Sequence, residues 1–327
     1  ASGSGRRGIC GQHAVIGSPL AMALLFSSLA WAQDTPPRPL GEPSLQALIT
    51  DPALNEISGI AASRRNDGIY WVHGDAPRPA ELLAINAKGT LIARLRIEGV
   101  RAVDWEDIAS YRKDGKAWLL IGDIGDNNGS RTHYEVIAVE EPEIDGKIST
   151  LSVKPAWRLR FHYADGAHDC EAMAVDTASN AILLINKHAP LAIHSLALDP
   201  PRHTAEVATA TRLGALESIP QPDAQERLAR FPSARFGGSP TGMDIDASGR
   251  LAVVLTYRDA WLFERRAGMS WVEAFGKPLQ RLPLPPLPQA EAIGFSADSR
   301  YFLIGSENLP APLLRVDLST EGGSAEH

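Results

Sequence analysis

Short apolar runs separated by turn-forming residues recur along the chain, and this spacing predicts strands. The runs at 69–72 and 182–185 contain only apolar residues, most of them β-branched, aromatic or leucine, which is typical of strands buried on both faces. Turn signals precede many such runs, as in Asn66-Asp67-Gly68. Helical periodicity is confined to residues 222–231. The pattern therefore predicts an all-β protein.

One local pattern occurs five times: a polar start, a small residue, a short apolar strand, a turn and a second apolar strand. The apolar anchors of the copies are separated by 48, 65, 70 and 50 residues and are Ile60, Ile108, Met173, Met243 and Ile293. These intervals suit the blades of a β-propeller with loop insertions. Five blades are favoured, and six is the alternative if residues 216–238 or the long second repeat hold a degenerate blade. An irregular β-sandwich is the competing architecture.

The last repeat lacks a fourth strand of its own, because no comparable apolar run follows residue 316. Residues 44–49 form a suitable strand near the other end of the chain. We expect them to pair with the last blade and close the ring. Residues 33–327 are thus predicted to form a single β-propeller domain.

The N-terminal segment has the features of an export signal. Arg6 and Arg7 precede an apolar run at 14–29, and Ala30-Trp31-Ala32 offers a small-x-small cleavage site. The run is shorter than the roughly 20 residues that a transmembrane helix needs. We expect residues 1–32 to be a signal peptide and the mature protein to be periplasmic or secreted without a membrane anchor. An uncleaved N-terminal anchor is the alternative.

Charge and cysteine content narrow the range of partners. Removal of Arg6 and Arg7 changes the formal charge from −7 to −9, which argues against nucleic acid and favours cations. Cys170 would be the only remaining cysteine, so no intramolecular disulfide is expected. Its neighbours Asp169 and Glu171 disfavour a thiolate, and we expect Cys170 to be a core residue.

Two polar columns precede the apolar anchors. Alternation along a strand directs both columns the same way, into the central channel of a propeller. The column four residues before the anchor consists of Glu56, Asp104, Asp169, Ser239 and Gln289. The column two residues before the anchor consists of Ser58, Glu106, Glu171, Thr241 and Glu291. Crowded carboxylates repel one another unless a cation or protons neutralise them. Alternatively, each acid only caps a loop.

Further polar residues end the second strands, and antiparallel pairing brings them to the same rim. Oxygen donors without cysteine pairs or a helical zinc motif favour Ca²⁺, with Mg²⁺ next. The predicted metal ligands are Glu56, Glu106, Glu171, Glu291 and Asp123. Asp104 and Asp169 are the predicted catalytic bases, and the predicted anion contacts are Arg131, Lys187 and Arg258. These cations could equally balance the acids.

At these residues the chain resembles bacterial secreted proteins described as phytase-like or esterase-like β-propellers. The resemblance covers most of residues 50–316, and its motifs are at 56–63, 104–109, 122–127 with 131, 168–172, 186–187, 241–245, 256–257, 291–293 and 306–307. It implies a divalent metal at the channel mouth, held by Glu56, Asp104, Glu106, Asp169, Glu171 and Glu291. A phytase's full phosphate-binding set is not matched.

Two functions follow from this sequence. The first is a metal-dependent hydrolase acting on a small anionic ester, phosphate or lactone. The second is a non-catalytic propeller that binds a protein or envelope ligand and uses calcium structurally. The residues leave open whether the protein is an enzyme.

Overall fold

Strands dominate the computed structural model, which describes residues 40–75, 79–145, 149–199 and 207–318. The chain from Pro37 onward forms one compact unit. The all-β prediction is confirmed, whereas the predicted signal peptide lies outside the described residues. Within the described residues, no helix is long and apolar enough to cross a membrane.

The strands form four hydrogen-bonded sheets. One sheet has the order β2-β3-β4-β5-β9, with bounds Ile57–Ala62, Ile69–Gly74, Glu81–Asn86, Leu91–Ile97 and Ser149–Val153. The largest has the order β11-β12-β13-β14-β10-β8-β7-β6, with bounds Cys170–Asp176, Ala181–Asn186, Ala192–Ala197, Ala208–Ala215, Trp157–Tyr163, Tyr134–Glu140, Lys116–Asp123 and Trp105–Lys113.

Two four-stranded sheets complete the set. The first has the order β15-β16-β17-β18, with bounds Pro240–Ile245, Leu251–Thr256, Asp259–Glu264 and Gln280–Pro283. The second has the order β1-β21-β20-β19, with bounds Ser44–Ile49, Ala311–Asp317, Tyr301–Ser306 and Ala290–Phe295. Here β1 pairs antiparallel with β21, with Ile49 opposite Ala311, so the N-terminal strand adjoins the last strand of the chain.

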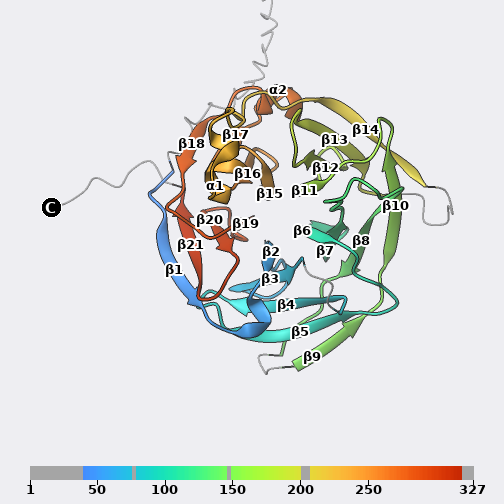
Figure 1. Cartoon of the computed structure of the whole chain (residues 1–327). Helices are drawn as coiled ribbons and strands as arrows, with labels where there is room; N and C mark the ends of the chain where they lie inside the picture. Colours follow the sequence, from blue (N-terminus) through green and yellow to red (C-terminus); the bar gives the residue numbers. More distant parts are fainter. Residues whose placement is uncertain (1–39, 76–78, 146–148, 200–206, 319–327) are drawn as a thin grey trace, which may run out of the picture. The chain divides into compact units, whose positions relative to one another are not determined.

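Five edge strands surround the centre of the unit, and we call them the inner strands. β2 contacts β6, β6 contacts β11, β11 contacts β15, β15 contacts β19, and β19 contacts β2. Figure 1 shows these strands around the middle, with the other strands of each sheet further out. This β-rich arrangement is consistent with a β-propeller-like architecture.

The core lies between neighbouring sheets, because the strands carry apolar side chains on both faces. Trp71 and Leu95 of one sheet share a buried cluster with Ile121 of the next. Full burial of such a side chain contributes roughly 1.5–3 kcal/mol. Cys170 belongs to another of these clusters, and burial raises the pKa of its thiol. The prediction that Cys170 is a core residue is therefore confirmed.

The helical elements are short and differ from the predicted helix at 222–231. That stretch contains only a 3₁₀ turn, Glu226–Leu228, and is followed by α1, Pro232–Arg235. The turn ends at Leu228 because Ala229 is extended, and Pro232 begins the next element, a position at which proline is tolerated. A second turn, Pro52–Leu54, precedes β2, and α2 spans Trp271–Phe275 with a capping box.

Candidate functional site

All five inner strands contain an irregularity at the same position near their start. In each strand the pairing register skips one residue, and the skipped residues are Ser58, Glu106, Glu171, Thr241 and Glu291. A bulge of this kind re-aims the side chain of the extra residue. These residues are the second polar column of the sequence. Their direction is therefore set by repeated bulges, and the regular alternation assumed from the sequence is wrong at this position.

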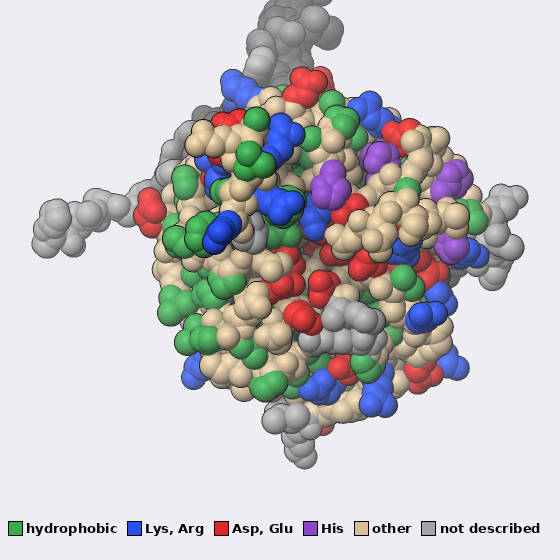
Figure 2. All heavy atoms as spheres, in the orientation of Figure 1, with side chains coloured by type: hydrophobic (Ala, Val, Ile, Leu, Met, Phe, Trp, Pro, Cys, Tyr) green, Lys and Arg blue, Asp and Glu red, His purple; other side chains and the backbone are tan. Residues whose placement is uncertain are grey.

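Three buried carboxylates meet where β6 and β11 begin. Oxygen atoms of Glu106, Asp169 and Glu171 lie within 4.8 Å of one another. Asp104 lies beside them, because a Cβ atom added to Gly125 would be 2.6 Å from Asp104 Oδ2 and 2.2 Å from Glu106 Oε1. We call Asp104, Glu106, Asp169 and Glu171 the central acidic cluster. Figure 2 shows Asp and Glu side chains gathered near the centre of this face.

Crowding and burial raise the pKa of three members of the cluster. Burial and then the charge of Glu171 hold the pKa of Glu106 well above its ordinary value. Burial raises the pKa of Glu171 to about 8, and it raises that of the half-exposed Asp104 to about 6. Protons or a cation are thus needed to neutralise the cluster at neutral pH.

Asp169 differs from the other three members of the cluster in having a lowered pKa. Although burial alone would raise its pKa, His188 and the backbone of Asp126 lower it overall. Nε2 of His188 lies 3.3 Å from Asp169 Oδ2, and the Asp126 amide donates to Asp169 Oδ1 at 2.7 Å. Asp169 therefore remains an anion beside the carboxyl groups whose pKa is raised.

Lys187 is the cation that contacts the cluster directly. Its Nζ donates a hydrogen bond to Glu171 Oε1, and it lies 5.9 Å from the centre of the Tyr257 ring. Burial opposes its charge, but the carboxylate of Glu171 keeps the pKa of Lys187 above its ordinary value. One ammonium thus faces several carboxylates, and the cluster retains an excess of negative charge.

A second acidic group, which we define as Asp75, Glu291 and Glu307, lies at the same face, and its oxygen atoms also lie within 4.8 Å of one another. Burial, followed by the hydrogen bond with Glu291, raises the pKa of Glu307 to about 9. Glu291 Oε1 accepts hydrogen bonds from Tyr257 Oη and Gln289 Nε2, both at 2.9 Å. Glu291 was predicted as a ligand, whereas Asp75 and Glu307 were signalled only by their position after second strands.

Asp123 and Arg131 support the cluster from outside it. Asp123 Oδ1 accepts a hydrogen bond from Arg131 Nη2 at 2.7 Å, and its Oδ2 accepts one from the Val103 amide at 3.0 Å. Arg131 Nη1 donates to the carbonyl of Gly125 at 2.8 Å. This pair holds the Gly125 backbone against the carboxylates. Asp123 was predicted as a metal ligand and Arg131 as an anion contact, and the structure pairs the two with each other.

The remaining predicted residues, Arg258 and Glu56, have other partners. Arg258 donates to Glu226 at 2.8 Å and to Asp259 at 3.2 Å, so it ties down the 216–238 insertion. Glu56 is half-buried, and its charge helps to raise the pKa of Glu307. Glu56 is thus electrostatically linked to the second acidic group.

Sequence reasoning missed two buried acids further along the inner strands. Asp107 Oδ2 accepts hydrogen bonds from the amides of Met173 at 2.8 Å and Met243 at 3.1 Å, so one carboxyl links three inner strands. Asp244 Oδ2 accepts one from the Phe295 amide at 2.8 Å. Each lies beside an apolar anchor, Asp107 before Ile108 and Asp244 after Met243, and an acid at that place is the signal that could have revealed both.

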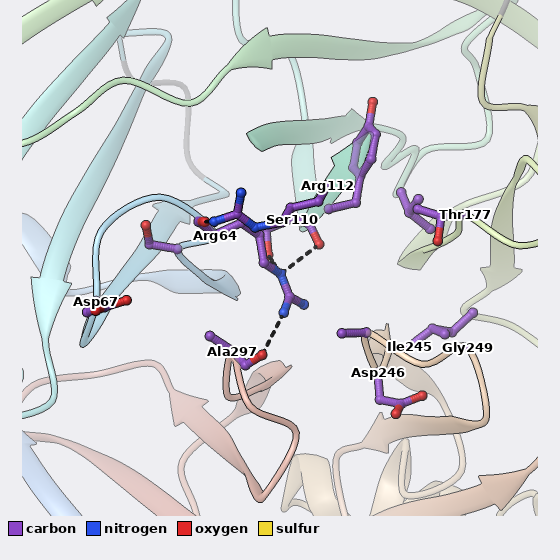
Figure 3. A pocket seen from close by; sticks show the side chains of 13 residues that line it. Arg64, Asp67, Ser110, Arg112, Thr177, Ile245, Asp246, Gly249 and Ala297 are labelled. Carbon is purple, nitrogen blue, oxygen red and sulfur yellow. Dashed lines mark hydrogen bonds between the residues drawn. The ribbon is translucent and has the colours of Figure 1, made fainter. Parts of the chain in front are cut away.

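The opposite ends of the inner strands enclose a pocket of about 360 Å³. Figure 3 shows Arg64 projecting among its lining residues. Arg64 Nε donates to Ser110 Oγ at 3.1 Å and Nη1 donates to the Ala297 carbonyl at 3.2 Å. These partners are neutral oxygens, so this end differs in charge from the acidic end.

No protein-family model matches the chain, and no curated protein matches it either. The functional argument therefore depends on the chemistry of the site. Carboxylate oxygens converging in a buried centre suit a hard divalent cation such as Ca²⁺.

Proposed function

We propose that the chain is an exported five-bladed β-propeller, similar to phytase-like and esterase-like propellers, that binds calcium and hydrolyses a small anionic ester, phosphate or lactone. The observation that carries this proposal is the convergence of Glu106, Asp169 and Glu171 within 4.8 Å. Export is inferred from residues 1–32 alone.

The strand order supports five blades. Each inner strand begins a run of four antiparallel strands, and the five runs are β2 to β5, β6-β7-β8-β10, β11 to β14, β15 to β18, and β19-β20-β21-β1. The parallel pairs β5–β9 and β10–β14 then join neighbouring blades at their outer edges. The 216–238 insertion contains only a 3₁₀ turn and α1, which leaves no strands for a sixth blade.

The charge balance supports a bound cation. Like charges buried together destabilise the folded state unless a counter-ion or protons compensate them. Glu106, Asp169 and Glu171 would hold the calcium, with Asp104 beside them. When bound, calcium supplies a Lewis acid that polarises a substrate oxygen and acidifies a coordinated water.

The chain's own residues would handle the proton and the substrate charge. Asp104 is half-exposed with a pKa of about 6, which suits a general base near neutral pH. Lys187 is already at the cluster and would contact the anionic group of the substrate. Asp169, fixed by His188 and the Asp126 amide, is better placed as a ligand than as the base.

A substrate screen tests the proposal. The calcium-loaded mature protein would be assayed on p-nitrophenyl phosphate, bis-p-nitrophenyl phosphate, acyl esters, lactones and phytate, beside Glu171→Gln and Glu264→Gln. Glu264 is an ion-paired carboxylate, 2.9 Å from Arg250, outside both acidic groups. We expect turnover to be abolished only in Glu171→Gln. Calcium binding without turnover of any substrate would contradict the hydrolase proposal and leave a calcium-binding propeller.

A further inference from the structure

Two histidines and an aspartate converge away from the central acidic cluster. One donor atom each from Asp165, His168 and His194 lies within 4.8 Å of the other two. Asp165 and His168 belong to the turn between β10 and β11, whereas His194 lies in β13. We call these three residues the histidine group. It combines imidazole nitrogens with a single carboxylate, unlike the all-carboxylate cluster at the centre.

His194 is buried without the hydrogen bonds that its ring would ordinarily make. Its side chain has 0% exposure, and neither ring nitrogen has a hydrogen-bond partner among the described residues. Leaving a buried polar group unpaired costs about 1–3 kcal/mol, so such a group calls for an explanation. The ring lies 4.8 Å from that of Tyr163 and 5.1 Å from that of His168, centre to centre. One ring nitrogen of His194 thus lies within 4.8 Å of a donor atom of each of the other two residues, and it has no hydrogen-bond partner among the described residues.

The other two members are ordered yet open to solvent. His168 Nε2 lies 2.8 Å from Asp165 Oδ1, and the His168 amide donates to Tyr134 Oη at 3.0 Å. Tyr134 Oη in turn donates to Asp126 Oδ2 at 2.9 Å. The backbone of His168 is thus fixed, while the exposed Asp165 leaves a path from solvent. The histidine group is therefore buried on the side of His194 and exposed to solvent on the side of Asp165.

We propose that Asp165, His168 and His194 form a binding site for a first-row transition metal, with zinc as its natural ion. Two imidazoles and one carboxylate are a common zinc donor set, and they leave a fourth position for water. Donors about 2.1 Å from a tetrahedral zinc lie roughly 3.4 Å apart, and the three donor atoms here lie within 4.8 Å of one another, so zinc would draw them together. Zinc would replace the proton shared by His168 and Asp165 and would give His194 its missing partner.

Calcium is a poor occupant of this site, because it selects oxygen donors. Zinc is thus separable from the calcium proposed for the central acidic cluster, and neither inference depends on the other. The two sites are adjacent in sequence, since Asp169 directly follows His168.

Competition against a chromophoric chelator would measure zinc affinity in untagged mature protein with millimolar calcium present. We expect one zinc equivalent, a loss of at least a hundredfold in affinity for His168→Asn, and at least tenfold for Asp165→Asn. His162→Asn, which alters a half-buried histidine of β10 outside the group, is the matched control and should bind zinc normally. Both test positions are at the surface, so folding should be retained, and a melting curve checks it.

A second readout identifies the ligands. Cobalt substituted for zinc should give the visible absorption of a site with nitrogen donors, and His194→Leu should abolish it. Absence of zinc binding, or unchanged affinity in both His168→Asn and Asp165→Asn, would overturn the proposal. So would loss of zinc in Glu106→Gln/Glu171→Gln, which would place the ion at the central acidic cluster. Calcium titrations of the same variants report separately on the proposed function.

Discussion

Carboxylates at the two ends of the inner strands have contrasting environments. At the end with the pocket, Asp176 accepts hydrogen bonds from Arg265, Ser179 and the Trp271 indole. Burial would raise its pKa, but these donors lower it below the ordinary value. At the other end, Glu106 is surrounded by further carboxylates and its pKa is raised. Donors of the protein itself thus compensate the charge of Asp176, whereas the pKa of Glu106 favours its neutral form unless a cation compensates it.

This contrast separates acids that stabilise the fold from acids that serve a ligand. A carboxylate with a lowered pKa favours the folded state when it is charged, whereas one with a raised pKa opposes folding in that form. The central acidic cluster costs the metal-free protein stability. A bound cation, as proposed above, would remove this cost, and the following experiments test that distinction.

The largest expected effect comes from removing one charge at each end. Asp176→Asn should lower the free energy of unfolding by about 3 kcal/mol or more, because it leaves Arg265 without its buried partner. Glu106→Gln should leave the free energy of unfolding unchanged or raise it, because the substitution relieves repulsion between the carboxylates of the central acidic cluster. Urea unfolding in EDTA at pH 7 would measure both. Equal destabilisation by the two substitutions would contradict the contrast.

Calcium should produce the next largest effect. An ion at a hundredfold excess over its Kd stabilises the folded state by about 2.7 kcal/mol, which corresponds to a rise of several degrees in Tm. Glu106→Gln/Glu171→Gln should not respond to calcium or EDTA. Calorimetry would measure the transition. Identical transitions in calcium and EDTA, with no heat on titrating divalent ions, would show that these acids bind no metal.

The smallest effect concerns pH and the buried Asp244. Burial raises the pKa of Asp244 to about 7, so the folded protein keeps a proton that the unfolded chain loses near pH 4. The stability that Asp244 contributes is therefore full below about pH 4 and is lost as pH rises through 7. In Asp244→Asn, the decrease in the free energy of unfolding between pH 5 and 8 should be smaller by up to about 2 kcal/mol. Unfolding at several pH values in EDTA, with the exposed Asp67→Asn as control, would check this. An unchanged slope would contradict it.

The sequence predicted much of the strand order because each repeat carries its own apolar anchor and turn. Ile60 and Met173, for example, both lie in inner strands. It could not predict the parallel pairings between repeats, in which β9 pairs with β5 and β10 pairs with β14. Such pairings depend on three-dimensional proximity and leave no periodic trace in the sequence.

The site was predicted only as far as the polar columns allowed. The columns contain Glu106, Asp169 and Glu171, which the structure brings together. They gave no indication that Arg258 pairs with Glu226, or that His194 meets His168, because those partners come from an insertion and from a different strand of the sheet. The bulges could not be predicted from the sequence either, because nothing in the sequence distinguishes a bulged residue from a regularly paired strand residue.

The repeated bulge allows the side chain at one position of each inner strand to vary while the backbone stays the same. Two of the five bulged residues carry hydroxyl groups that form hydrogen bonds to the neighbouring sheet. Ser58 Oγ donates to the Glu106 carbonyl at 2.9 Å, and Thr241 Oγ1 donates to the Ala290 carbonyl at 2.7 Å. The other three carry carboxylates. The same bulge therefore presents either a hydroxyl group that donates to the next inner strand or a carboxylate. A single substitution per repeat could exchange these two kinds of side chain while the surrounding strands keep their places.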